Sequence, residues 1–216
     1  DEEIVTEPAG TTACMFWGLG GDGTVGSNKN SVKIIGDHTN KYVQAYFVYD
    51  SKKSGGITVS HLRFGDKPIT SEYTITAPNF VACHNPAYIG RYDMLAGIVD
   101  GGTFLINSEL PADKVFESFT REMQEVIVRK HVKVYTIDAL KLAGGAVGVF
   151  AGWLVERHCI RFHTPDTTVK KLIRFLGGMV VLLAIMKGLK PLLNAALGLS
   201  VGSFVRYLLV GLFATT

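Results

Sequence analysis

Cysteine is scarce in this chain, which holds three cysteines among 216 residues. Cys14, Cys83 and Cys159 are odd in number and far apart, and none belongs to a Cys-x-x-Cys pair. This usage signals neither a disulfide framework nor an iron–sulfur or zinc site, and it fits a reducing compartment. Cys14 and Cys83 lie in apolar runs, so we expect buried, unreactive thiols and no metal ligands.

A secretory signal is also lacking. Residues 1–10 are acidic and contain a proline and a glycine, with no basic segment that leads into an apolar one. We interpret residues 1–10 as a linker from a preceding domain.

Acidic residues are nearly absent from the last third of the chain. Residues 144–216 carry eight Lys and Arg against two Asp and Glu, a net charge of +6, whereas residues 1–143 carry 14 against 17, a net charge of −3. The chain therefore divides into a part with an ordinary soluble surface and a part that is apolar and basic.

Glycine, by contrast, is abundant where the first apolar run ends. Residues 13–17 enter a cluster of five glycines between Gly18 and Gly26, and the chain continues with apolar residues at helical spacing, which predicts a strand, a tight turn and a helix. Two overlapping Gly-x-Gly-x-x-Gly patterns fit an anion-binding turn, in which a ligand approaches the backbone amides at the helix N-terminus. The spacing alone is equally compatible with a tight turn that holds no ligand.

Short apolar strands alternate with helical segments through the rest of this part, which predicts a right-handed α/β fold with a mostly parallel, Rossmann-like sheet and flanking helices. The glycine turn is then expected at the carboxyl ends of the strands, where such sheets bind ligands. We predict strands at 13–17, 43–49, 57–64, 72–75, 79–83, 103–107 and 132–137, and helices at 24–37, 88–99 and 112–130.

Residues 11–143 resemble a known family through several ordered blocks. These are FWGLGGDGTVGSNKNSVKIIGD from Phe16, and the segments 46–56, 59–65, 80–84 and 101–108. Together they are similar to the γ domain of pyruvate:ferredoxin (flavodoxin) oxidoreductase, which is either an internal segment of a long polypeptide or a separate small subunit.

The resemblance implies a part in the oxidative decarboxylation of pyruvate to acetyl-CoA, through assembly and the coenzyme A side of the active site. It places thiamine diphosphate and the iron–sulfur clusters in partner domains or subunits, with ferredoxin or flavodoxin as indirect partners, so this chain is expected to hold no catalytic residue and to bind no nucleic acid. The candidate coenzyme A contacts are Gly20, Gly21, Asp22, Gly23, Thr24, Val25 and Gly26, with Asn28, Lys29, Lys52 and Lys53 as phosphate partners. Lys52 and Lys53 are equally compatible with a solvated turn.

Three histidine and arginine side chains of this part receive structural roles. His61 and Arg63 lie in the most family-like strand and are expected to pack at a domain interface. His84 follows a buried strand and is expected to cap or pack rather than to act as a base.

Beyond residue 143 the resemblance changes. The pattern of a glycine-rich apolar helix, Glu156-Arg157, Ile160-Arg161-Phe162 and further apolar helices is similar to the last part of type 2 phosphatidic acid phosphatases. None of the catalytic motifs of that class is present, so we expect no phosphatase activity.

Apolar stretches at 142–155, 173–193 and 197–214 predict an all-α, transmembrane segment, because they become long enough to span a bilayer once single snorkelling charges are included. The alternative is a pair of buried core helices. The basic cluster between Arg157 and Arg174 is expected to face the cytoplasm, as is the α/β domain, which gives a membrane protein.

The two placements conflict, however, if 142–155 crosses the bilayer, since the α/β domain would then lie on the opposite side. Either that stretch does not span, or the chain is a fusion of two pieces. The second function in view is therefore a noncatalytic, membrane-anchored fusion or adaptor.

Overall fold

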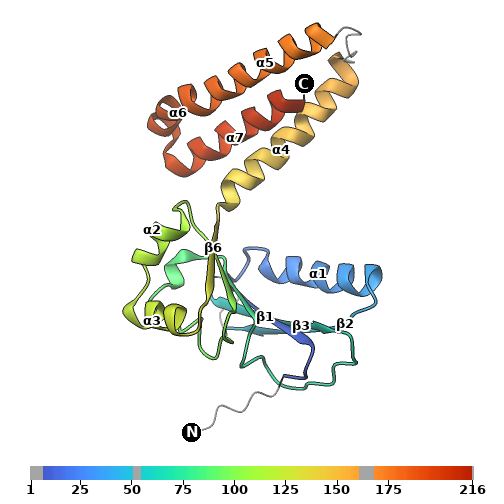
Figure 1. Ribbon diagram of the computed structural model, residues 1–216, viewed down its shortest axis with the longest axis vertical. Coiled ribbons are helices and arrows are strands. Elements are labelled where there is room, and N and C mark those ends of the chain that lie inside the picture. The colour runs from blue at the N-terminus through green and yellow to red at the C-terminus, as the bar shows by residue number, and fades with distance from the viewer. Residues whose placement is uncertain (1–6, 51–54, 161–167, 216) are drawn as a thin grey trace. The chain divides into compact units, whose positions relative to one another are not determined.

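The chain folds into two compact units, Asp1–Ile137 and Asp138–Thr216, in a computed structural model that describes residues 7–50, 55–160 and 168–215. The first unit is an α/β domain and the second is all helical, as the change in composition predicts (Figure 1). The division by contacts comes just before the compositional change at residue 144, because the first helix of the second unit already begins at Ala139, after Asp138 as its N-cap.

A six-stranded sheet organises the α/β unit, with the strand order β2-β3-β1-β4-β5-β6. The strands are β1 (Thr11–Leu19), β2 (Tyr42–Tyr49), β3 (Ile57–Gly65), β4 (Phe80–Cys83), β5 (Thr103–Asn107) and β6 (Lys133–Ile137).

The prediction of a mostly parallel sheet is only partly correct. β1, β4, β5 and β6 run parallel, but β3 is antiparallel to both β1 and β2. The reason is that β2 and β3 form a hairpin joined by a short loop, which allows antiparallel pairing only. The sheet is therefore mixed, and the start of β3 lies at the carboxyl end of β1, where Leu19 pairs with Ile57.

The helices of this unit are α1 (Thr24–His38), the short 3-10 helix η1 (Pro86–Tyr88), α2 (Ala112–Glu117) and α3 (Arg121–Arg129). The predicted helix 112–130 is thus two helices, because Thr120 caps α3 by accepting a hydrogen bond of 3.3 Å from the Met123 amide. The predicted strand 72–75 does not form: the Ile75 amide donates instead to Nδ1 of the buried His61, at 3.1 Å.

The predicted helix 88–99 is also wrong, apart from the end of η1. Gly90 and Gly97 have positive φ values of 74° and 67°, which interrupt a helix. A Cβ on Gly97 would collide with the Thr76 carbonyl, so the segment folds as turns that approach the backbone closely. Its apolar residues Tyr88, Met94 and Leu95 are nevertheless buried in the core. The spacing of apolar residues here therefore indicates which side chains are buried, but it does not indicate a helix.

The core lies between the central strands and the segments that follow them. It is centred on Val81, Phe104 and Ile106 of β4 and β5. These strands are covered by Val115 of α2, by Met123 and Ile127 of α3, and by Phe119 between the two helices, all on the face that the spacing predicts. Cys14 and Cys83 are buried as expected, and burial raises the pKa of Cys14 to about 12 and that of Cys83 to about 11, so both stay protonated and unreactive.

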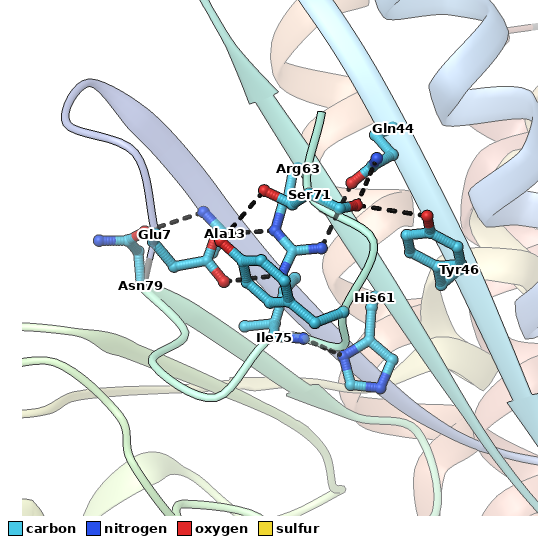
Figure 2. Close-up of polar contacts among 10 residues, drawn as sticks. Glu7, Ala13, Gln44, Tyr46, His61, Arg63, Ser71, Ile75 and Asn79 are labelled. Carbon is cyan, nitrogen blue, oxygen red and sulfur yellow. Dashed lines mark hydrogen bonds and ion pairs between the residues drawn. The ribbon is translucent and has the colours of Figure 1, made fainter. Parts of the chain in front are cut away.

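Arg63 on β3 is buried and forms a charged pair with Glu7 (Figure 2). Its Nε and Nη2 donate to the two carboxylate oxygens of Glu7 at 2.7 and 2.8 Å, and its Nη1 donates to Gln44 at 3.3 Å. The Arg63 and Glu7 side chains are only 1% and 7% exposed. Glu7, which falls in the predicted linker 1–10, therefore packs against the α/β unit, and Arg63 has its partner inside this unit.

The helical unit consists of α4 (Ala139–Val155), η2 (Glu156–Ile160), α5 (Thr168–Leu183), η3 (Ala184–Gly188), α6 (Leu189–Leu197) and α7 (Leu199–Thr215). Within this unit α4 and α7 lie side by side (Figure 1). Gly144, Gly148 and Gly152 are the buried residues of α4, and a Cβ on Gly148 would collide with the Leu208 carbonyl of α7. Glycines spaced by four thus let the two backbones approach closely.

The Glu7–Arg63 pair gives a first prediction. Glu7→Gln leaves a buried guanidinium without its counter-charge and should lower the free energy of unfolding by about 3–5 kcal/mol. Urea unfolding followed by Trp17 fluorescence, in a Trp153→Phe background, measures the α/β unit. Asp66→Asn removes the exposed Lys41–Asp66 pair, whose side chains are 41% and 75% exposed, and should cost less than about 1 kcal/mol. Equal effects of the two substitutions would contradict a special role for the buried pair.

His61 gives a second prediction, on pH. Burial lowers its pKa to about 4, helped by the Arg63 charge and opposed by Glu7. Since the unfolded state then binds the proton first, His61 stabilises the fold fully above about pH 6.5 and loses this contribution as the pH falls towards 4. The expected loss between about pH 7 and 4.5 is about 2–3 kcal/mol. His61→Gln should remove that part of the pH dependence in the same urea assay, and an unchanged dependence would refute the assignment.

Candidate functional site

A cavity of about 750 Å³ lies at the glycine turn, at the carboxyl end of β1. The turn supplies one wall, from Leu19 to Gly23 together with Val25 of α1. The β2–β3 hairpin supplies the other wall, with Tyr49, Asp50, Ile57 and Thr58. The glycine turn therefore borders a cavity. The alternative interpretation, a tight turn that holds no ligand, does not require one.

Asp22 holds the turn in place. Its two carboxylate oxygens accept hydrogen bonds from the Leu19 amide at 2.8 Å and the Thr24 amide at 2.7 Å, which tie the end of β1 to the first residue of α1. Burial raises the pKa of Asp22, but the hydrogen bonds from Thr24 and Leu19 and the nearby His84 outweigh it and leave the pKa below its usual value. Asp22 is thus an ionised, structural part of the turn.

Glycine is required at two kinds of position here. A Cβ on Gly18 would collide with the Thr24 side chain, so Gly18 makes room for the Asp22–Thr24 contact. Gly21 and Gly23 have positive φ values of 96° and 90°, which side chains rarely allow. Gly26 has neither constraint, since its Cβ direction is open.

The structure divides the predicted amide donors of the turn into two groups. The Gly20 amide donates to the Gly56 carbonyl at 2.7 Å, the Asp22 amide to Leu19 at 2.9 Å, and the Thr24 amide to Asp22. Within the described residues, no hydrogen bond occupies the amides of Gly21, Gly23, Val25 and Gly26. The last two belong to the first turn of α1, where backbone amides lack helical partners.

The other predicted contacts lie outside the lining. Asn28 is buried at 3% exposure, with its Nδ2 unpaired among the described residues, and Lys29 places its Nζ 5.7 Å from the Phe47 ring centre. Neither side chain borders the cavity. Lys52 and Lys53 fall outside the described residues.

His84 takes the packing role predicted for it. Its Nδ1 shares a hydrogen bond of 2.7 Å with Thr24 Oγ1, which joins the residue after β4 to the start of α1. Burial lowers the pKa of His84 although the Asp22 carboxylate opposes this. His84 is therefore mostly neutral near pH 7 and secures the turn from the opposite side to Leu19.

Sequence reasoning missed the second wall of the cavity. Thr58 lines the cavity, and its Oγ1 is buried without a hydrogen-bond partner among the described residues. Its position follows from the antiparallel register that pairs Gly18 with Thr58. The short loop between the two apolar runs 43–49 and 57–64 was the signal for this hairpin.

The cavity combines apolar side chains from both walls, Leu19, Val25 and Ile57, with backbone amide donors and the carboxyl groups of Asp22 and Asp50. Across the described ranges, no group of three or more His, Cys, Asp or Glu side chains is placed to hold a metal ion. This arrangement suits binding of an organic ligand with hydrogen-bond acceptors rather than acid–base or metal chemistry.

Comparison with known proteins extends these findings. A model of the family described as pyruvate ferredoxin/flavodoxin oxidoreductase matches residues 13–187. The chain is 57% identical over 142 residues to pyruvate:ferredoxin oxidoreductase of Moorella thermoacetica, covering 66% of this chain and 12% of that protein. It is 51% identical over 146 residues to a putative pyruvate-flavodoxin oxidoreductase of Synechocystis sp., covering 68% and 12%.

Among solved structures, pyruvate oxidoreductase subunit PORC of Thermotoga maritima matches with 16% identity and a TM-score of 0.45, over 94% of this chain and 96% of that chain. The matches do not support the resemblance of residues 144–216 to membrane phosphatases, and the family match continues across residue 143 to residue 187.

The mixed sheet and the cavity at its glycine turn define an α/β domain. With most of its length matched, the chain belongs to the pyruvate ferredoxin/flavodoxin oxidoreductase family. It spans 12% of the length of the curated relatives given above, so it corresponds to one module of such proteins.

Proposed function

We propose that this chain is the γ-like module of a pyruvate:ferredoxin or pyruvate:flavodoxin oxidoreductase and contributes to coenzyme A binding, without catalysing turnover alone. Support comes from family membership, from strong identity over the α/β unit's length, and from relatives named as these enzymes. The observation that carries the coenzyme A part is the cavity at the glycine turn, where unpartnered backbone amides lie beside apolar side chains of both walls.

Coenzyme A suits these features in a specific way. The open amides of Val25 and Gly26, at the positive end of α1, are donors for phosphate or carbonyl oxygens. The apolar side chains of both walls suit the alkyl parts of the pantetheine arm. The Asp22 carboxylate repels a phosphate placed directly on the Leu19–Thr24 turn, so the phosphates belong on the α1 side of the cavity. Lys29, held near Phe47, is a longer-range cation for them.

Thiamine diphosphate and the iron–sulfur clusters belong, in this proposal, to partner domains or subunits. Cys14 and Cys83 are buried, protonated thiols of the α/β unit. Ferredoxin or flavodoxin then meets the assembly rather than this module.

The coenzyme A proposal predicts a clear effect of Gly26→Val. The new side chain enters open space, so the fold should persist, but its methyl groups cover the approach to the first-turn amides. Calorimetry on the full chain assembled with its partner subunits should show at least about tenfold weaker coenzyme A binding, as hydrogen bonds to a charged group are lost. Lys33→Val, on an exposed position of the same helix, is the control and should bind as the parent does. If Gly26→Val binds coenzyme A with unchanged affinity, the glycine turn is a tight turn that holds no ligand.

A membrane-anchored protein is the second candidate function, and the helical unit favours it. By length and composition, Ala139–His158 and Lys171–Leu197 could cross a membrane, and no residue in the most apolar window of Lys171–Leu197 is buried. A helix of about 20 residues spans about 30 Å, the thickness of the hydrocarbon core. We propose that this unit inserts into lipid and that the α/β unit faces the cytoplasm.

Fractionation tests the membrane proposal separately. The full chain should stay in the pellet on carbonate extraction and require detergent, because large apolar side chains such as Ile173, Phe175 and Leu192 are more than half exposed. A chain that ends at Ala143 should remain in the supernatant. Full-length protein that remains in the supernatant as a monomer would rule out membrane insertion and leave the coenzyme A proposal untouched.

A further inference from the structure

The helical unit contains a strongly basic pocket that the function above does not use. The pocket has a volume of about 430 Å³ and is lined by Lys141 of α4, Leu183 of α5, Met186 and Lys187 of η3, Lys190 of α6, and Arg206 and Tyr207 of α7. Four cationic side chains thus converge from four elements, and no carboxylate lines the pocket. Such a convergence concentrates positive potential on a small volume.

Arg206 is the buried member of this set. It is 6% exposed, and its Nε and Nη1 are buried without a hydrogen-bond partner among the described residues. A guanidinium is a planar cation with hydrogen-bond donors only and no acceptor. The Tyr207 ring, 5.6 Å from the Arg206 Cζ, offers a π face but no oxygen in the guanidinium plane. Two donors and one charge therefore remain for an anion to satisfy.

The lysines differ in how much charge they leave to the pocket. Lys141 forms an ion pair of 2.6 Å with Asp138, which offsets its charge in part. Lys187 and Lys190 are exposed at the pocket and belong to consecutive helical turns around the short π-helix η3. The pocket thus joins one buried, fixed guanidinium to two long, adaptable ammonium groups.

We propose that this pocket binds a phosphate group, carried either by a soluble phosphate ester or by the headgroup of an anionic lipid. The unpartnered Nε and Nη1 of Arg206 lie on different edges of its guanidinium, so each can donate one charge-assisted hydrogen bond to a phosphate oxygen. The ammonium groups bind phosphate oxygens as point charges. A phosphate carries up to two negative charges and so neutralises several cations better than a single carboxylate does. The remaining volume holds what is attached to the phosphate. Basic pockets between apolar helices are also where lipid headgroups bind when the helices lie in a bilayer.

Two titrations distinguish the sources of the phosphate. The full chain, in a neutral detergent, is titrated with inorganic phosphate by calorimetry. It is then titrated with micelles of the same detergent that contain phosphatidic acid, and with micelles that contain diacylglycerol, which lacks only the phosphate. Binding of inorganic phosphate indicates a soluble ester site. Binding of phosphatidic acid alone indicates a headgroup site. Absence of binding in both titrations overturns the proposal.

Substitutions assign any binding to this pocket. Arg206→Gln should weaken phosphate or phosphatidic acid binding at least about tenfold, as a charged hydrogen-bond donor is lost. Because Arg206 is buried and its replacement can unfold the unit, the double variant Lys187→Gln/Lys190→Gln, at exposed positions, provides the second test and should weaken binding by a similar factor. Lys171→Gln removes an exposed lysine of α5 outside the pocket and should leave the affinity unchanged. Equal losses in Lys171→Gln and the double variant would show charge attraction without a site and would overturn the proposal.

Discussion

The carboxylate of Asp22 is the constraint on which the α/β unit's site depends. By accepting from the amides of Leu19 and Thr24, it fixes where β1 ends and α1 begins, and His84 fastens Thr24 to the end of β4. Gly18 must lack a side chain for this arrangement to form. The same contacts affect the chemistry of the cavity, because they occupy the amides of Leu19 and Thr24 and leave those of Gly21, Gly23 and Val25 as donors at the lining. A carboxylate in the turn also places negative charge where a simple phosphate cradle has none.

The sequence predicted the elements around this turn well and their pairing less well. Periodicity located β1, α1, β3 and the core face of α2 and α3, since burial of apolar side chains decides those positions. It could not distinguish buried turns from a helix at 88–99, where Gly97 approaches the Thr76 backbone through a contact between distant residues. Nor did it give the direction of β3, which depends on the hairpin loop rather than on the strand's own residues. Thr58 entered the site only through that pairing.

The helical unit follows a different packing rule from the α/β unit. In the α/β unit, large apolar side chains fill the core, whereas α4 and α7 meet through glycines and leave many large apolar side chains outside. In water, large apolar side chains are mostly buried. In a lipid bilayer such side chains face lipid, and helices associate through small residues that let their backbones approach closely. The family match, which continues to residue 187, also links part of this unit to the α/β unit in sequence and weakens the view of two unrelated fused pieces.

Each unit contains one buried arginine, and the two differ in whether their own unit supplies a negatively charged partner. Arg63 and Arg206 are 1% and 6% exposed, so both guanidinium groups have lost most of their water. Arg63 recovers that loss through the two oxygens of Glu7 and through Gln44, all from the α/β unit. Arg206 has only the Tyr207 ring beside it, with lysines as its charged neighbours in the pocket. Both guanidinium groups are desolvated, so the phosphate that we propose would supply near Arg206 the negative charge that Glu7 supplies to Arg63.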